Sequence, residues 1–181
     1  MVSLNGRRRR TIRITGHNTG PDNALTPRMR WALEEAVREY NALNLDLRFL
    51  LDFANANLRN QDIVFVRDNS VSVAVAGPPA NGNPASLVRL NGNDLSNMSR
   101  ARVKTVMMHE LGHTIGFRHT DWFDKSISCG GPRNVEQPGA IHIPGTSRNT
   151  AANIDRNSIM LSCSTAEDFS RQDIVALRFL Y

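Results

Sequence analysis

The chain has 181 residues, of which 40% are hydrophobic, with 12 Gly and 8 Pro, a composition that excludes fibrous, low-complexity and disordered proteins. Its net charge of +5 depends on one run of arginines near the N-terminus, and the rest of the chain is almost neutral, which argues against nucleic acid as a partner. No stretch approaches the roughly 18 to 20 consecutive apolar residues of a membrane-spanning helix, so we expect neither a transmembrane segment nor a membrane partner.

The arginine run opens the chain. It consists of Arg7, Arg8, Arg9 and Arg10, with no aromatic residue among them. Like charges in a row repel one another, so we interpret residues 1–10 as a solvated basic tail. No apolar stretch follows the charges, so the segment does not have the form of a signal peptide.

Residues 11–116 alternate between strand and helix patterns. Residues 11–15 alternate polar and apolar side chains, which predicts a half-buried strand. Thr26 and Pro27 resemble the N-cap and first residue of an amphipathic helix that continues to residue 43. Further strands are predicted at residues 45–51, 62–67, 71–76 and 86–90, and a second long helix from about residue 98 to Gly116. These elements predict a mixed sheet packed against helices.

Residues 120–169 have no sustained periodicity and are rich in Gly, Pro, Asn and Ser. Within this segment, only residues 140–144 have a pattern that predicts a short extended stretch. A long irregular segment within a compact domain is usually functional or is pinned in place. After it, Ser170 and Asp173 resemble a capping box at the start of a short last helix.

The residues that indicate chemistry spell H-E-x-x-H-x-x-G-x-x-H over residues 109–119. His109 and His113 are one helical turn apart, so both rings can reach one metal ion at about 2.1 Å. Glu110 is rotated by about 100° around the helix axis, which suits a general base beside the metal better than a ligand. Average residue usage makes this eleven-residue pattern rare by chance, about one chain in 10⁵.

Gly116 can adopt the left-handed conformation that ends a helix and turns the chain back. This turn would let His119 approach the metal from a second direction. Three protein ligands leave a fourth position for water, the arrangement of a catalytic zinc site. We therefore expect one catalytic Zn²⁺ held by His109, His113 and His119. His17 and His142 are isolated in the sequence, and we assign them no metal role.

At these residues the chain resembles the metzincin metallopeptidases. Residues 157–160 resemble the Met-turn of that family, with Met160 as its methionine. The tracts 116–121, 139–146 and 173–181 look like the bacterial myroilysin-like group of metzincins. Ser162 stands where astacin-type relatives carry a tyrosine, which disfavours that subgroup.

The resemblance implies an α+β fold in two parts. An upper subdomain, residues 11–119, would hold a mixed, mostly parallel twisted sheet and two long helices. A lower, irregular subdomain, residues 120–181, would end in a C-terminal helix, with a cleft between the two. The resemblance also assigns substrate binding to the edge strand before the zinc helix, for which residues 71–76 are the candidate. Its pairing residues would be Val73, Ala74, Val75 and Ala76.

The two cysteines, Cys129 and Cys163, are too few for a disulfide framework and are compatible with either one bridge or two free thiols. We expect the bridge, which belongs to an oxidising compartment.

The sequence therefore predicts a secreted, monomeric zinc endopeptidase that acts on protein or peptide substrates. Glu110 would activate the water bound to zinc. Two alternatives stay open. One is a non-catalytic binding protein that keeps zinc as a scaffold and binds through its basic tail. The other is a zinc amidase acting on small substrates.

Overall fold

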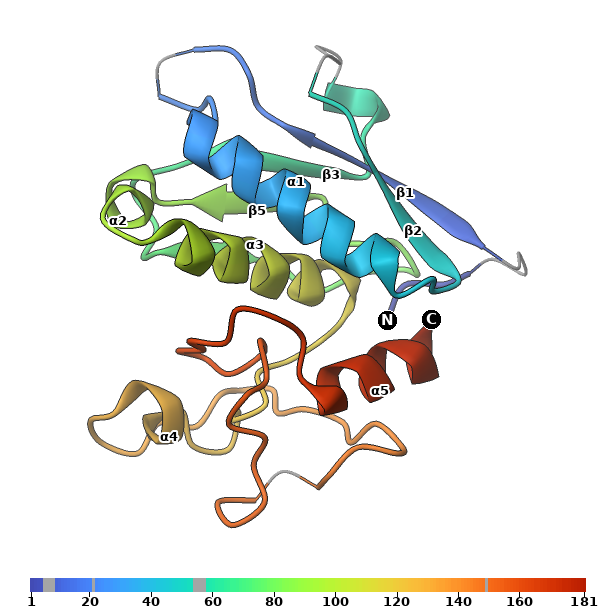
Figure 1. Ribbon diagram of the computed structural model, residues 1–181, viewed down its shortest axis with the longest axis vertical. Helices are drawn as coiled ribbons and strands as arrows, with labels where there is room; N and C mark the ends of the chain where they lie inside the picture. Colours follow the sequence, from blue (N-terminus) through green and yellow to red (C-terminus); the bar gives the residue numbers. More distant parts are fainter. Residues whose placement is uncertain (5–8, 21, 54–57, 149) are drawn as a thin grey trace. The chain divides into compact units, whose positions relative to one another are not determined.

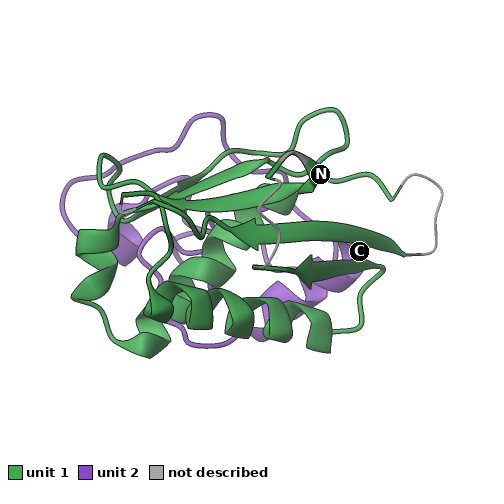
Figure 2. Cartoon of the chain, turned by 90° about the horizontal axis from the view of Figure 1, so that it is seen from above, with its two compact units in different colours: residues 1–116 green, residues 117–181 purple. Residues whose placement is uncertain are grey.

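The structure is a computed structural model that describes residues 1–181 except 5–8, 21, 54–57 and 149. The chain forms two compact units, residues 1–116 and residues 117–181 (Figure 2). His119 thus belongs to the second unit, three residues after the first one ends. No helix among the described residues is both long and apolar enough to cross a membrane.

The first unit contains a five-stranded sheet with the order β2-β1-β3-β5-β4 (Figure 1). The first four strands in that order run parallel to their neighbours, and β4 is antiparallel to β5 at the edge. The mixed, mostly parallel sheet expected from the sequence is confirmed. The strands are β1 (Arg10–Gly16), β2 (Leu47–Leu51), β3 (Ile63–Arg67), β4 (Ala74–Ala76) and β5 (Leu87–Leu90).

Helix α1 (Pro27–Ala42) connects β1 to its parallel neighbour β2, a connection that parallel strands require. The Thr26 side chain caps the helix by accepting a hydrogen bond from the Met29 amide, and Pro27 occupies the first turn, as predicted. Ile12 and Ile14 of β1 are fully buried, whereas Thr11 and Arg13, which alternate with them along the strand, are exposed. One face of the sheet therefore carries the apolar side chains that the helices cover (Figure 1).

Helix α3 (Arg100–Ile115) lies beside α1 and carries the H-E-x-x-H residues. The Ser99 side chain caps its start, and Gly116 ends it with φ of 120°. The Tyr40 hydroxyl of α1 donates a hydrogen bond to the Met108 carbonyl over 2.9 Å. This bond fixes α3 against α1 at the residue directly before His109. Two short helical segments, η1 (Leu58–Asn60) and α2 (Gly92–Ser96), complete the unit.

The edge strand is shorter than predicted. We expected a strand over residues 71–76, but β4 begins at Ala74, and Val73 has a positive φ of 52°. The reason is that side chains pair with the backbone before the strand starts. Asn91 donates its side-chain amide to the Val71 carbonyl, and the Asp94 carboxylate accepts the Val73 amide. Including Val73 among the strand residues was therefore wrong.

The described part of the predicted basic tail is partly ordered. Val2 is 2% exposed, and the Ser3 amide donates to the Gly82 carbonyl over 2.9 Å. Arg10 begins β1, and its guanidinium donates to the Gly82 carbonyl over 2.6 Å. The ends of residues 1–10 thus pack onto the sheet unit, contrary to the expectation of a solvated tail. Arg7 and Arg8, within the predicted run, lie outside the described residues.

The second unit is mostly irregular, as the sequence predicts. Its helices are α4 (Ser126–Cys129) and α5 (Arg171–Leu180), and α5 begins with the predicted capping box of Ser170 and Asp173. Residues 140–144, expected to be extended, pair with no strand of the described chain.

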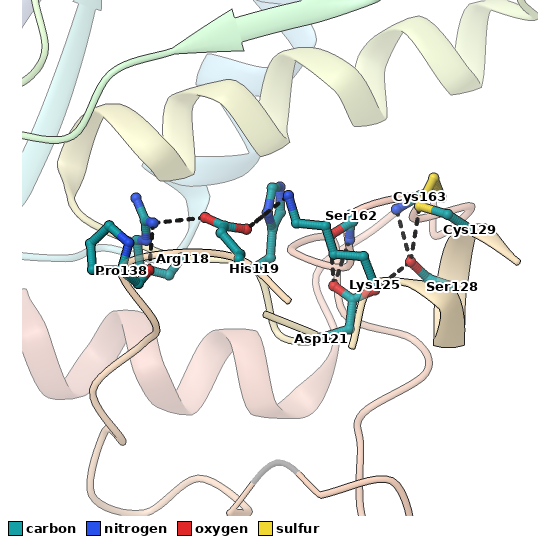
Figure 3. Close-up of polar contacts among 10 residues, drawn as sticks. Arg118, His119, Asp121, Lys125, Ser128, Cys129, Pro138, Ser162 and Cys163 are labelled. Carbon is teal, nitrogen blue, oxygen red and sulfur yellow. Dashed lines mark hydrogen bonds and ion pairs between the residues drawn. A yellow bond between two sulfur atoms is a disulfide. The ribbon is translucent and has the colours of Figure 1, made fainter. Parts of the chain in front are cut away.

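The predicted disulfide between Cys129 and Cys163 is present. Next to it, Asp121 is fully buried and accepts hydrogen bonds from the Ser128 hydroxyl and from the amide and hydroxyl of Ser162 (Figure 3). The Ser128 hydroxyl also accepts the Cys163 amide over 3.0 Å. The bridge and this carboxylate together tie the segment after His119 to the segment after Met160.

We expect the double variant Cys129→Ser/Cys163→Ser to unfold with a free energy about 4 kcal/mol lower, because the bridge closes a loop with a sequence separation of 34 residues. Chemical denaturation of both proteins under non-reducing conditions measures the difference. Thr165→Ala, an exposed change near the bridge, is the control and should have almost no effect. Equal stability of the double variant and the wild type would show that hydrogen bonds alone hold this segment.

Candidate metal centre

His109 and His113 lie on the same side of α3, one turn apart. Their ring centroids are 4.6 Å apart and the rings are nearly perpendicular, at 88°. His109 is 9% exposed and His113 is half-buried. The helix thus holds two imidazoles close enough to share one ion.

His119 joins these two residues through the turn at Gly116. One nitrogen atom from each of His109, His113 and His119 lies within 4.8 Å of the others. Three imidazole nitrogens form a donor set that suits a first-row divalent metal such as zinc, and they leave a coordination position for water. The three residues that the sequence motif selects are therefore brought together, and they could hold one metal ion.

Glu110 lies beside this set and is 5% exposed. Its carboxylate accepts a hydrogen bond from the Ala76 amide of β4, while its Oε2 atom has no partner among the described residues. Burial raises the pKa of Glu110 to about 8, although the Ala76 bond acts in the opposite direction. A cation nearby would also favour the ionised form. An unpaired, buried carboxylate oxygen of this kind suits a metal-bound water and would pair with it.

The edge strand β4 borders the same residues in the first unit. Ala76 donates its amide to Glu110, and Val75 is 39% exposed. β4 pairs with β5 on one side and is the last strand of the sheet. An edge strand offers unpaired backbone groups to an extended peptide.

In the second unit, the turn that contains Met160 contacts the residue after His119. The Thr120 amide donates to the Met160 carbonyl over 2.8 Å, and Met160 is 4% exposed. The Ser158 hydroxyl lies 2.9 Å from the Thr120 hydroxyl and donates to Asp173 over 2.6 Å. A chain of hydrogen bonds thus runs from the neighbour of His119 through the turn to helix α5.

Asp173 is the end of that chain and is 8% exposed. Burial raises its carboxyl pKa above the usual value, although donors at Ser158, Ile159 and Ser170 act in the opposite direction. The sequence predicted Asp173 only as a capping residue. Its bond to the Ser158 hydroxyl has no sequence signal, because the two residues share no motif or period.

We expect Asp173→Asn to lower the free energy of unfolding by about 2 to 3 kcal/mol, because the carboxylate accepts at both oxygens, from Ser158 on one side and from the Ile159 and Ser170 amides on the other. An amide accepts at only one oxygen, so a buried donor on the other side would lose its acceptor. Thermal and chemical denaturation measure the change. Glu167→Gln, an exposed acid-to-amide change in the same unit, is the control. If Asp173→Asn were as stable as the control, the carboxylate would not be what anchors the turn.

Sequence reasoning missed Glu136. Its carboxylate contacts His119 Nδ1 and also pairs with Arg118 and Lys125, three side chains that Figure 3 labels. Burial by itself raises the pKa of the Glu136 carboxyl, but the bonds and charges of His119 and Lys125 hold it below its usual value. A single glutamate in an aperiodic segment carries no pattern that could have identified it.

His142, which we expected to be outside the metal site, is exposed, and its Nε2 lies 3.0 Å from the Thr146 carbonyl. Neither His142 nor His17 joins the three-histidine cluster among the described residues.

Comparison with known proteins agrees with this site. The dual-action HEIGH metallopeptidase family matches residues 2–181, and the chain reads H-E-L-G-H at residues 109–113. No curated protein matches the chain. One structure of myroilysin is similar with a TM-score of 0.58 and 14% identity, covering 95% of this chain and 92% of that chain. A crystal structure of myroilysin is similar with a TM-score of 0.55 and 14% identity, covering 96% of this chain and 86% of that chain. The fold similarity and the family together confirm the expected resemblance to a myroilysin-like metzincin.

Proposed function

Because the chain belongs to the dual-action HEIGH metallopeptidase family and is therefore a metalloprotease, we propose that it is a zinc endopeptidase cleaving peptide bonds within extended protein or peptide substrates. The observation that carries this proposal is the pairing of the three-histidine set with a buried carboxylate oxygen, Glu110 Oε2, that lacks a partner among the described residues. A purely structural metal site would not need such a base.

His109, His113 and His119 would hold the ion through one nitrogen each. The chemistry that zinc supplies when bound is Lewis acidity toward a carbonyl and a water with a pKa near neutrality. Glu110 would accept the proton of the attacking water at Oε2 and return it to the leaving amine. Burial of Glu110 excludes bulk water from this proton transfer.

Strand β4 would bind the substrate. Its position at the sheet edge supports antiparallel or parallel pairing with an extended peptide through backbone groups of Ala74, Val75 and Ala76. Binding through backbone groups recognises chain conformation more than side chains. This favours unfolded or flexible polypeptides as substrates and internal bonds as cleavage sites.

We propose further that the protein acts outside the cytoplasm. The disulfide between Cys129 and Cys163 supports this placement, because such bridges persist in oxidising compartments. Protein purified from the extracellular medium and from cells, compared by immunoblot, tests the proposal. Accumulation only inside cells would contradict it.

Digestion of unfolded casein tests the main proposal. We expect cleavage that a chelator abolishes and that one equivalent of Zn²⁺ restores. Cleavage of small amides without cleavage of casein would favour the zinc amidase. Zinc binding with no hydrolysis of either substrate would favour a binding protein with a zinc scaffold.

A further inference from the structure

Glu136 pairs with three nitrogen-bearing side chains of the second unit, Arg118, His119 and Lys125, which are labelled in Figure 3. Oε1 lies 2.8 Å from Arg118 Nη2. Oε2 contacts His119 Nδ1 and lies 3.1 Å from Lys125 Nζ. The Glu136 side chain is only 13% exposed, so these contacts are largely shielded from solvent.

The backbone around this carboxylate is also fixed. The Glu136 amide donates to the Trp122 carbonyl over 2.7 Å, and the Lys125 amide donates to the Asn134 carbonyl over 2.7 Å. Arg118 Nη2 also donates to the Pro138 carbonyl over 2.7 Å. The segment from residue 122 to residue 138 therefore folds back on the turn that carries His119. The conformation of this segment places the Glu136 carboxylate against the His119 imidazole.

The contact at Nδ1 decides which nitrogen of His119 is available. A neutral imidazole has one N–H donor and one lone pair. With Nδ1–H donating to a carboxylate, the lone pair is on Nε2, the only ring atom left to bind a metal. Arg118 and Lys125 pair with the two oxygens of the same carboxylate and so hold it in place beside the ring. A carboxylate in this position also makes the ligand nitrogen more basic.

We propose that Glu136 is a positioning residue for the metal centre: it holds the His119 ring with Nε2 directed to the ion and fixes the tautomer that can bind it. The inference rests on the proposed function to the extent that His119 is a metal ligand. It explains why a long aperiodic segment follows the zinc motif, since that segment supplies the partner of the third ligand.

The test is the zinc affinity of the full chain, measured by competition with a chromophoric chelator. We expect Glu136→Ala to bind zinc about 10- to 100-fold more weakly, the usual cost of losing an outer partner of a ligand. Glu136→Gln should lose less, because its amide oxygen can still accept the Nδ1–H bond. With zinc saturating, KM for a peptide should stay near the wild-type value, because the proposed role of Glu136 is to hold a metal ligand and not to bind substrate.

The matched control is Asp124→Asn. The Asp124 carboxylate accepts bonds from Ser126 and from the Asn134 amide, so the variant perturbs the same segment without removing the contact to His119. It should bind zinc like the wild type. Equal weakening in Asp124→Asn and Glu136→Ala would assign the effect to loop disruption and overturn the proposal.

The failures are distinguishable. Wild-type protein that binds zinc and cleaves peptides, together with Glu136→Ala and Glu136→Gln variants that bind zinc within twofold of it, would overturn the role of Glu136 alone. Wild-type protein that binds no zinc would overturn the proposed function and this role with it. If Glu136→Ala does not fold, Glu136→Met decides, because it keeps a side chain of similar length but has no oxygen to accept the Nδ1–H bond. Undiminished zinc affinity in that variant would overturn the proposal.

Discussion

Glu110→Gln should fold, retain one equivalent of zinc and lose at least about 10³-fold in kcat. Glutamine keeps the size and shape of the side chain but cannot accept a proton. General acid–base catalysis contributes about 10²- to 10⁴-fold, and this residue would serve both the attack of water and the departure of the amine. KM should change much less, because the substrate would be held by β4 and the metal.

Steady-state kinetics on a fluorogenic peptide, with the zinc content of the same samples, measures this effect. Glu34→Gln, an exposed change on α1, is the matched control and should retain full activity. Near-normal turnover of Glu110→Gln with full zinc would remove Glu110 from the mechanism. It would also remove the main argument for hydrolysis at this site.

The second large effect concerns the third ligand. His119→Ala leaves two protein ligands on one helix, so we expect the protein to lose most of its zinc and nearly all peptidase activity. The loss of affinity should exceed the 10- to 100-fold that removal of an outer partner costs. Metal analysis after dialysis against a weak chelator measures it.

His142→Ala is the control for His119→Ala, since His142 is exposed and outside the three-histidine cluster. It should keep full zinc and activity. A His142→Ala variant without zinc, beside a His119→Ala variant with zinc, would show that the ligand assignment is wrong.

The regular elements could be predicted because their signals are local. Thr26 caps the first long helix and Gly116 ends the second one, as the sequence indicates. The second helix has Ser99 as its cap, close to the start that the sequence predicts. The spacing of the histidines identifies the metal centre for the same reason, since each interval is a helical turn or a chain reversal.

The remaining features depend on contacts between residues far apart in the sequence. The sequence pattern includes Val73 in a strand, but the Val73 amide donates to the Asp94 carboxylate and the strand begins at Ala74. Glu136 reaches His119 through a segment whose path is set by individual side-chain bonds and a disulfide. Neither contact produces a repeating pattern of residues in the sequence, so neither could be predicted from composition or periodicity.

The bond between the Ala76 amide and Glu110 has a consequence for protein engineering. The strand proposed to receive the substrate is also a direct partner of the proposed base, so recognition and turnover share one backbone group. Substitutions on β4 intended to alter selectivity would shift the carboxylate as well, and libraries built there would yield changed selectivity coupled to slower enzymes.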